Sequence, residues 1–305
     1  MNFSKRIILL VLIFVGSLSK ILAQSTHVLS YNQPAEFFEE SLLLGNGKMG
    51  ATVFGGVNFD KIYLNDITLW SGEPVNTNMN PEAYKNIPAI REALKNENYP
   101  LAEELNKKIQ GKNSESYAPL GTLEIHHQNS EKFEKYYREL DVSTAISMVN
   151  YSINGVNFTR EYFVSAPDKI LVIKLISSKK GALNFTLNTN SLLNFKTVVE
   201  GNIFKMKGRA PIHENAGYKV PSEYLKQKER GTRFTSLVKI KNTDGSIISE
   251  ADKIGVKNAT EAIIFVSVGT SFNGFDKNPE TEGLNDEKIA EVNLNNAFKK
   301  SYQTL

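Results

Sequence analysis

The chain has 305 residues, enough for one large domain or two ordinary ones, and its 36 basic and 33 acidic side chains give a net charge of +3. Three of the basic residues, Lys5, Arg6 and Lys20, lie in a predicted leader, so 33 basic side chains balance 33 acidic ones in the remainder. This neutral balance argues against nucleic acid as a partner, because phosphate binding depends on an excess of Lys and Arg. The absence of cysteine excludes disulfides and thiolate metal sites.

The N-terminus has the parts of a secretory signal peptide. A basic start at Lys5 and Arg6 precedes an apolar run over residues 7–15, and small and polar residues follow up to Ala23. The apolar run is shorter than the roughly 20 residues that span a bilayer, and no second run follows. We therefore expect residues 1–23 to be a signal peptide and the protein to be exported, periplasmic or extracellular, without a stable membrane anchor.

The glycine-rich stretch LGNGKMG at residues 44–50 precedes an apolar run, ATVFGGV. It lacks the Lys-Ser/Thr ending and the flanking β-α unit of a phosphate-binding loop. We therefore interpret it as a tight turn that leads into a strand, with glycine supplying a positive φ.

Residues 81–109 carry apolar side chains at helical spacing, which predicts two short helices inserted between strands. Pro88 and Pro100 stand where the first turn of each helix is expected, a position that tolerates proline. The last segment, residues 285–305, is also helical in composition.

From Tyr151 onward, short β-branched and aromatic runs alternate with turn residues. Asn154-Gly155 predicts a hairpin, because both residues tolerate positive φ, and Asp244-Gly245 marks another turn. Many short strands at such spacing predict a mainly β protein with a large antiparallel β-sandwich, rather than a parallel α/β sheet.

The histidines give little sign of a metal site. None of the four has the spacing of a zinc motif. His126 and His127 are adjacent in a strand pattern, so their side chains point to opposite faces. We expect no metal and no cofactor.

The single tryptophan, Trp70, lies in the stretch LNDITLWSGEP. Its neighbours leave three interpretations open: a stacking platform for sugars, a catalytic carboxylate site, or a packed corner of the fold. The acidic candidates are Asp66, Glu73, Glu39 and Glu40, but a chain with 33 acids always offers some pair.

The order of several blocks carries a family resemblance. LGNGKMGATVFGGV, LNDITLWSGEP and NPEAYKNIPAIREAL, then SYAPLGTLEIHH and the hairpin run that begins YYRELDVSTAISMVNYSINGV, follow one another along the chain. Together they resemble the N-terminal domain of glycoside hydrolase family 95, the inverting α-L-fucosidases and related α-L-galactosidases. The likeness extends over nearly all of the chain after the leader.

The resemblance implies a β-sandwich of the super-sandwich type over residues 24–284, and the start of a helical linker over residues 285–305. In the family, that linker leads to an (α/α)6 barrel, which holds the catalytic acid and the residues that activate water. The resemblance therefore implies no catalytic residue in this chain, which corresponds to the N-terminal part of such an enzyme. The glycan substrate would be bound through the barrel of the complete enzyme.

The resemblance also suggests a role for the LNDITLWSGEP stretch at the junction with the barrel. We predict that Asn46, Asn65, Asp66 and Trp70 contact either the next domain or a glycan. Two other interpretations stay open: a free-standing carbohydrate-binding sandwich, and a docking partner for a separately encoded barrel. An exposed aromatic patch would favour the first, and an open apolar patch would favour the second.

Overall fold

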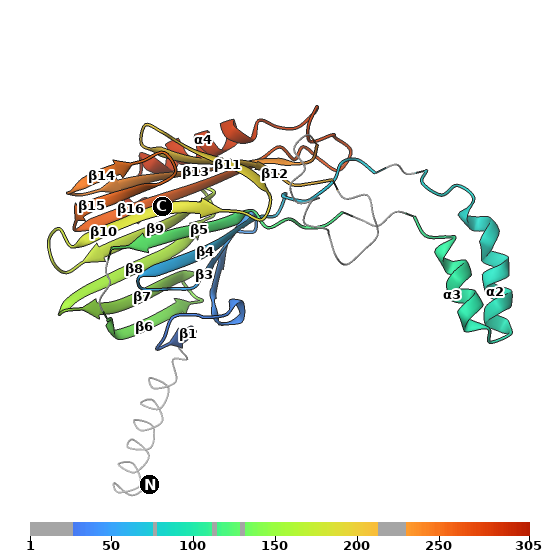
Figure 1. The fold of residues 1–305 in the computed structure, drawn as a ribbon, viewed down its shortest axis with the longest axis horizontal. Coiled ribbons are helices and arrows are strands. Elements are labelled where there is room, and N and C mark those ends of the chain that lie inside the picture. The colour runs from blue at the N-terminus through green and yellow to red at the C-terminus, as the bar shows by residue number, and fades with distance from the viewer. Residues whose placement is uncertain (1–26, 76–77, 112–114, 129–131, 213–229) are drawn as a thin grey trace, which may run out of the picture.

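A computed structural model describes residues 27–75, 78–111, 115–128, 132–212 and 230–305. In these residues the chain forms two antiparallel sheets that pack face to face, with one helix against the larger sheet (Figure 1). The expected signal peptide, residues 1–23, lies outside the described residues. The prediction of a mainly β, antiparallel sandwich is confirmed.

The larger sheet, sheet A, has nine strands within the described residues, and neighbours in the sheet run antiparallel. In spatial order they are β1 (Val28–Tyr31), β6 (Glu134–Asp141), β7 (Ile146–Ile153), β8 (Val156–Ser165), β9 (Ile170–Ser177), β16 (Glu261–Thr270), β13 (Arg233–Asn242), β12 (Ile203–Arg209) and β11 (Asn194–Glu200). The β6–β9 part is a meander of hairpins, whereas β16 enters between β9 and β13 from far along the chain.

The smaller sheet, sheet B, has seven strands in the same part of the chain. In order they are β14 (Ser246–Ser249), β15 (Ile254–Ala259), β10 (Leu183–Asn190), β5 (Gly121–His127), β4 (Phe59–Asp66), β3 (Met49–Val53) and β2 (Leu42–Gly45). Alternate residues of β4 are buried, with Ile62 and Leu64 in the core between the sheets and Tyr63 and Asn65 on the outer face. Each such buried aliphatic side chain contributes about 1.5–3 kcal/mol.

The turns follow the sequence signals. Asn154 and Gly155, with φ of 50° and 77°, close the β7–β8 hairpin as predicted. Gly47, with φ of 85°, lies in the turn between β2 and β3, which confirms the turn interpretation of LGNGKMG. The turn at Asp244-Gly245 has a different role, because it takes the chain from β13 in sheet A to β14 in sheet B.

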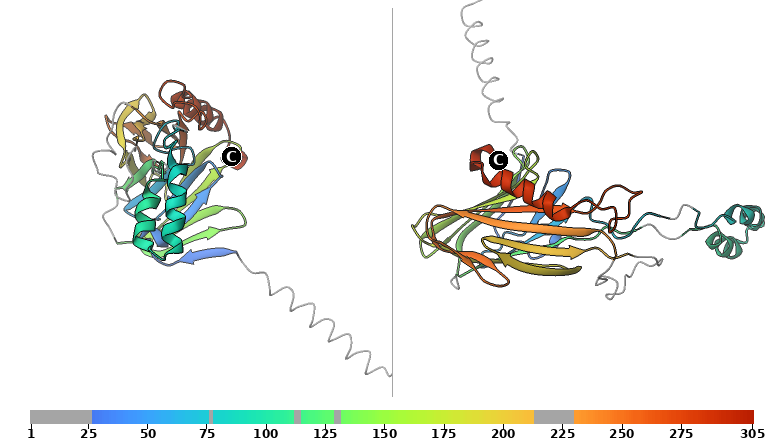
Figure 2. Two further views of the ribbon diagram at one scale, coloured as in Figure 1. Left: turned by 90° about the vertical axis from the view of Figure 1, so that its right-hand side faces the viewer. Right: turned by 90° about the horizontal axis from the view of Figure 1, so that it is seen from above.

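Helix α4 (Asp286–Phe298) covers the outer face of sheet A, above β13 and β16 (Figure 2, right). Ala290 and Leu294 of the helix pack on Ile263, Phe265 and other apolar side chains of that face. Strand β16 is therefore buried on both faces, which explains why it is apolar almost throughout instead of alternating. The predicted helical segment 285–305 thus forms α4 and a short 3-10 helix, η4 (Tyr302–Thr304).

The two predicted inserted helices are α2 (Ile87–Lys95) and α3 (Tyr99–Lys107), and each has its proline in the first turn. They form a helical hairpin with the 3-10 turn η2 (Ala83–Asn86) at the end of an arm that extends beyond the sheets (Figures 1 and 2). Ala93 and Ala102 are the buried residues of these two helices. Four of their larger apolar side chains are exposed, namely Ile87, Leu94, Tyr99 and Leu101, while Ile90 and Leu105 are half-buried.

Candidate functional site

The four predicted site residues lie around two adjacent loops at one end of the sandwich. These are the β2–β3 turn, residues 46–48, and the loop that follows β4, residues 67–71. The amide of Ile67 donates to the carbonyl of Lys48 (2.8 Å), so the two loops lie side by side. The pairing of β3 with β4 places Asp66 opposite Met49, and Asn65 opposite Gly50.

Asn46 holds the β2–β3 turn and ties it to sheet A. Its Oδ1 accepts hydrogen bonds from the amides of Lys48 (3.0 Å) and Met49 (2.8 Å). Its Nδ2 donates to the carbonyl of Ser165 at the end of β8 (2.9 Å). An amide side chain suits this position because it supplies an acceptor and a donor at once.

Asp66 is fully buried, and its Oδ2 has no hydrogen-bond partner in the described part of the chain. Its Oδ1 accepts from the amide (2.9 Å) and the hydroxyl (2.5 Å) of Thr68, while Lys48 Nζ lies 3.9 Å from Oδ2. The Thr68 hydroxyl is also 2.6 Å from the hydroxyl of Thr270 at the end of β16. Asp66 therefore shapes the loop, and Thr68 links that loop to sheet A.

Asn65 points the other way, to the outer face of sheet B. Its amide lies against Gly50, where an added Cβ would collide with Oδ1 of Asn65. The Asn65 amide also lies close to the hydroxyl of Tyr117. Partial burial raises the pKa of Tyr117, and the nearby Asn65 amide opposes that effect in part.

Trp70 is 45% exposed, although its indole N–H has a partner. The Nε1 donates to the carbonyl of Ile67 (2.9 Å). Its ring meets that of Tyr117 edge to face, with 6.1 Å between centroids, and a β-bridge joins the two residues. The N–H partner expected of a packed corner is present, but the ring also forms part of an exposed aromatic pair.

Two of the other three acidic candidates, Glu73 and Glu40, have structural partners. Glu73 pairs with Arg230, and its Oε2 accepts from Nδ2 of Asn278 (3.1 Å). Glu39 and Glu40 lie in the 3-10 helix η1 (Phe38–Glu40), and the Glu40 carboxylate accepts from the amide of Glu36 (2.8 Å). These contacts fix loops, and they do not set two carboxyl groups across a common space.

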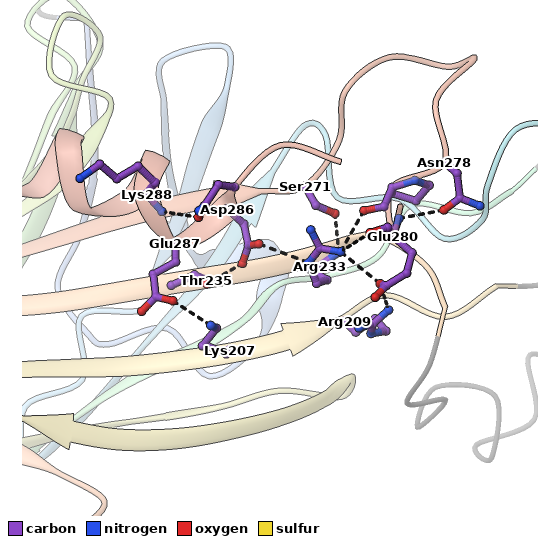
Figure 3. Close-up of polar contacts among 12 residues, drawn as sticks. Lys207, Arg209, Arg233, Thr235, Ser271, Asn278, Glu280, Asp286, Glu287 and Lys288 are labelled. Atoms are coloured by element: carbon purple, nitrogen blue, oxygen red, sulfur yellow. Dashed lines mark hydrogen bonds and ion pairs between the residues drawn. The ribbon is translucent and has the colours of Figure 1, made fainter. Parts of the chain in front are cut away.

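A second polar cluster joins the 271–285 loop to sheet A (Figure 3). Arg233 on β13 donates through Nη1 to the carbonyls of Pro279 (3.2 Å) and Glu280 (3.0 Å). The carboxylate of Glu280 in turn pairs with Arg209 and Arg233, and these contacts lower its pKa against the opposing effect of burial. The cluster includes Asn278, whose side chain donates to Glu73, so it also contacts the segment that follows Trp70.

The start of α4 belongs to the same cluster. The Asp286 carboxylate accepts from the hydroxyl of Thr235 on β13 (2.6 Å), and Glu287 contacts Lys205 (2.5 Å) and Lys207 (2.8 Å) on β12. Acidic side chains suit the first turn of a helix, where the dipole is positive. Sequence reasoning missed these residues, although Asn285 followed by two acids is a helix-start signal, and Asn285 does cap α4.

A groove of about 630 Å³ lies beside Asn65 and Tyr117. Side chains or backbone of twelve residues line it: Phe38, Thr52, Tyr63, Leu64, Asn65, Tyr117, Pro119, Gly121, Thr122, Asn190, Ser191 and Leu192. The lining includes no charged residue. Sequence reasoning placed Asn65 near a functional surface but gave no sign of the groove.

The adjacent histidines lie on opposite faces of β5, as predicted, with His126 against Phe59 and His127 against Phe185. Among the described residues, no three His, Cys, Asp or Glu side chains gather in the way a metal ion requires.

None of the helices in that part of the chain is long and apolar enough to cross a membrane.

Comparison with known proteins gives consistent matches. The family model described as "Glycosyl hydrolase family 65, N-terminal domain" matches residues 29–274. "Alpha-L-fucosidase 2" of Arabidopsis thaliana is 27% identical over 289 residues, which are 91% of this chain and 34% of that protein. "Probable alpha-fucosidase A" of Aspergillus oryzae is 25% identical over 250 residues, which are 77% of this chain and 32% of that protein.

Among solved structures, "Putative kojibiose phosphorylase from human microbiome" superposes with a TM-score of 0.51 at 11% identity. The match covers 92% of this chain and 36% of that one, and at this identity it bears on the fold alone. The chain spans about a third of the length of the curated relatives it matches.

Proposed function

The chain belongs to the family of glycosyl hydrolase family 65 N-terminal domains, and we propose that it serves as the N-terminal β-sandwich domain of an α-L-fucosidase-like enzyme. The substrate of the whole enzyme would be a fucosylated or related glycan. The expectation of a glycoside hydrolase N-terminal domain is confirmed, and membership of family 95 in particular remains part of the proposal.

One observation carries the choice of fucosidase. The match to "Alpha-L-fucosidase 2" of Arabidopsis thaliana covers 91% of this chain, so it extends over both sheets and the helical hairpin. The same match covers 34% of that relative, which leaves most of its length for other domains. We place catalysis in such a further domain, because Asp66 is fully buried with its Oδ1 holding a loop, and the Glu73 carboxylate is engaged by Arg230 and Asn278.

The proposed chemistry is hydrolysis with inversion. A carboxylic acid of the catalytic domain would protonate the leaving oxygen while a base activates water on the opposite face of the sugar. The sandwich would serve this reaction by supporting the catalytic domain. The corner that carries Asn46, Asn65 and Trp70, with Asp66 buried beneath it, is the surface that we assign to the domain junction, because its exposed Trp70 and Tyr117 rings offer apolar contact area.

Export is also part of the proposal. Residues 1–23 would be removed on secretion, and N-terminal sequencing of the protein recovered from the periplasm or medium tests this directly. A recovered protein that still begins at Met1 would contradict it.

The activity test compares two proteins. The first is this chain alone, and the second is the chain extended by whatever the gene encodes after Leu305. We expect the extended protein to hydrolyse an aryl α-L-fucoside faster than an aryl α-L-galactoside, and this chain alone to be inactive on both. Proton NMR of the first-formed sugar checks inversion. Hydrolysis by this chain alone would overturn the placement of catalysis, and Asp66 and Glu73 would then be the first residues to replace.

A second candidate function, a free-standing carbohydrate-binding sandwich, is favoured by the exposure of Trp70 at 45% and of Tyr117 at 43%. A stop codon directly after Leu305, together with glycan binding by this chain, would support it over the domain of a longer enzyme. If the chain instead binds a separately encoded barrel, co-purification of the two would favour the docking interpretation.

A further inference from the structure

The groove beside Asn65 has a floor built by strand register. Thr52 of β3 pairs with Tyr63 of β4, Tyr63 with Thr122 of β5, and Thr122 with Asn190 of β10. These four residues therefore form one row across four neighbouring strands, on the outer face of sheet B. Because the row belongs to the sheet, the hydrogen-bonded backbone of four strands fixes the spacing of these residues.

The walls rise from three loops around this row. Phe38 comes from η1, Tyr117 from the segment before β5, and Leu192 from the β10–β11 connection. All three side chains are exposed, Leu192 at 69%. The groove thus combines an open polar floor with apolar walls.

The aromatic side chains of the groove are positioned in advance of any ligand. Phe38 and Tyr63 lie nearly parallel, with an interplanar angle of 17° and 6.3 Å between centroids. Phe54 supports the Tyr63 ring edge-on at 5.0 Å. The Tyr117 ring is held edge to face by Trp70, with 6.1 Å between centroids. Preorganisation of this kind lowers the entropic cost of binding.

The chemistry of the lining selects a class of ligand. Its polar groups are neutral hydroxyls and amides, from Thr52, Thr122, Asn190, Ser191 and Asn65, and no charged side chain lines the groove. An anionic ligand would lose water and find no counter-charge in the lining itself. The Nζ of Lys61 lies 5.8 Å from the centroid of the Tyr63 ring, but it is already seated over the Phe54 ring at 4.0 Å. A ligand with apolar faces and hydroxyl edges would instead stack on the rings and exchange hydrogen bonds with the floor.

We propose that this groove is a binding site for a neutral oligosaccharide, with Tyr63 as the stacking surface and Asn65 and Asn190 as hydrogen-bonding partners. The choice of saccharide among neutral polyhydroxylated ligands rests on the proposed function. The groove itself rests on the register and the lining. It gives the sandwich a role in holding the glycan next to the surface assigned to the domain junction, with which the groove shares Asn65 and Tyr117.

The test uses the whole chain and its single tryptophan. Trp70 contacts Tyr117, which lines the groove, so a ligand in the groove changes the surroundings of the only indole in the chain. The probes are fucosyl-lactose and cellotetraose, both neutral, and tri-galacturonate, which is anionic. We expect saturable changes in fluorescence with at least one neutral probe and none with the anionic one, and calorimetry gives the Kd independently.

Two variants locate the site. Tyr63→Ala removes the stacking surface and should weaken binding by at least ~10-fold. Leu192→Arg introduces a charge from an exposed loop position, where folding is little affected, and should weaken binding to the same extent. The matched control is Tyr84→Ala, which removes an exposed tyrosine on η2 and should leave the Kd unchanged within about twofold.

Three results would overturn the inference: no saturable change with either neutral probe up to about 10 mM, equal binding of the anionic probe, or binding that both groove variants leave unchanged. The outcome is separable from that of the activity test. Fucosidase activity of the extended protein without neutral-glycan binding by this chain overturns the groove alone. Glycan binding without fucosidase activity overturns the proposed function alone.

Discussion

Arg160 and Asp60 form an ion pair inside the sandwich, with 3.5 Å between Nη1 and Oδ2 and both side chains exposed by 1% or less. The pair joins the sheets, because Asp60 is on β4 and Arg160 on β8. Tyr162 donates to Asp60 Oδ2 (2.7 Å), and Arg160 donates to the carbonyls of Gly56 (2.6 Å) and Val57 (2.7 Å). Burial raises the pKa of Asp60, and the Arg160 charge opposes that shift.

We predict that Arg160→Met strongly destabilises the fold. It leaves the Asp60 carboxylate buried without its counter-charge and strips two loop carbonyls of their donor, which costs about 3–5 kcal/mol. Urea unfolding measures the change. The double variant Asp60→Leu with Arg160→Met should recover part of the loss, and Lys196→Met, on the exposed edge strand β11, should change stability by less than ~0.5 kcal/mol. A loss below about 1 kcal/mol in Arg160→Met would contradict a structural role for the pair.

His127 should make the fold sensitive to mild acid. Its Nε2 is buried and has no hydrogen-bond partner in the described part of the chain, and burial, followed by the nearby charges of Arg160 and His126, lowers its pKa well below 6.5. Below pH 6.5, His127 therefore binds a proton in the unfolded chain but stays neutral in the folded chain. Stability is full above pH 6.5 and falls as the pH drops below it, by at most ~1.4 kcal/mol per pH unit from this group.

The measurement is the urea midpoint at about pH 7.5 and about pH 5.5. His127→Gln should reduce the difference between the two midpoints, whereas His126→Gln, on the outer face of the same strand, should preserve it. The idea fails if both variants keep the pH dependence of the original chain.

Replacing Asn46 should separate its two structural contributions. Asn46→Ala loses both acceptor bonds in the turn and the donor bond to Ser165, and should cost about 1–3 kcal/mol. Asn46→Asp keeps the acceptors but has no donor for the Ser165 carbonyl, so it should fall between Ala and the original residue. Thermal unfolding checks the order, and an Asp variant less stable than the Ala variant would contradict it.

The stability that Glu287 contributes by holding α4 to β12 should depend on pH. Its hydrogen bonds from Lys205 and Lys207 lower its pKa from 4.5 to about 2. A lowered carboxyl pKa contributes stability that is present above 4.5 and is lost as the pH falls from there toward 2. Glu287→Gln should thus lower Tm at about pH 6 and have a smaller effect at about pH 3. Glu291→Gln, on the same helix, is the control, and an effect of Glu287→Gln that does not shrink in acid would contradict the assignment.

The hairpin of α2 and α3 should open far more readily than the sheets. Each helix has nine residues, below the length at which isolated helices are stable, and the pair buries little more than Ala93 and Ala102. We expect its amides to exchange with deuterium at least ~100-fold faster than those of β9 and β16. Equal protection in this chain would mean that the hairpin is stabilised by contacts with the sandwich.

Local signals in the sequence were enough for the hairpin turn at Asn154-Gly155, the proline-led helices and the antiparallel class, because each depends on neighbours along the chain. The buried Asp60–Arg160 pair could not be predicted. Its partners are far apart in sequence, and nothing in the pattern around either one distinguishes it from a solvated charge.

The candidate site likewise has features that local sequence predicts and features that depend on distant parts of the chain. The LNDITLWSGEP stretch was singled out from the sequence, and its residues do gather with Asn46 at one corner. The opposite orientations of Asn65 and Asp66 follow from strand alternation, but which of them is buried depends on the position of sheet A. The groove row from Thr52 to Asn190 needs the register of four strands, which no single segment encodes.

The position of β16 between β9 and β13 sets an order for folding. Strand β9 is complete at Ser177, yet its second neighbour in the sheet does not begin until Glu261, so the centre of sheet A forms by closing a long loop. Until β16 is made, the apolar edge of β9 is open to other chains. Such non-local pairing predicts slow folding, and it makes a ribosome-bound chain that ends before β16 the species most in need of a chaperone.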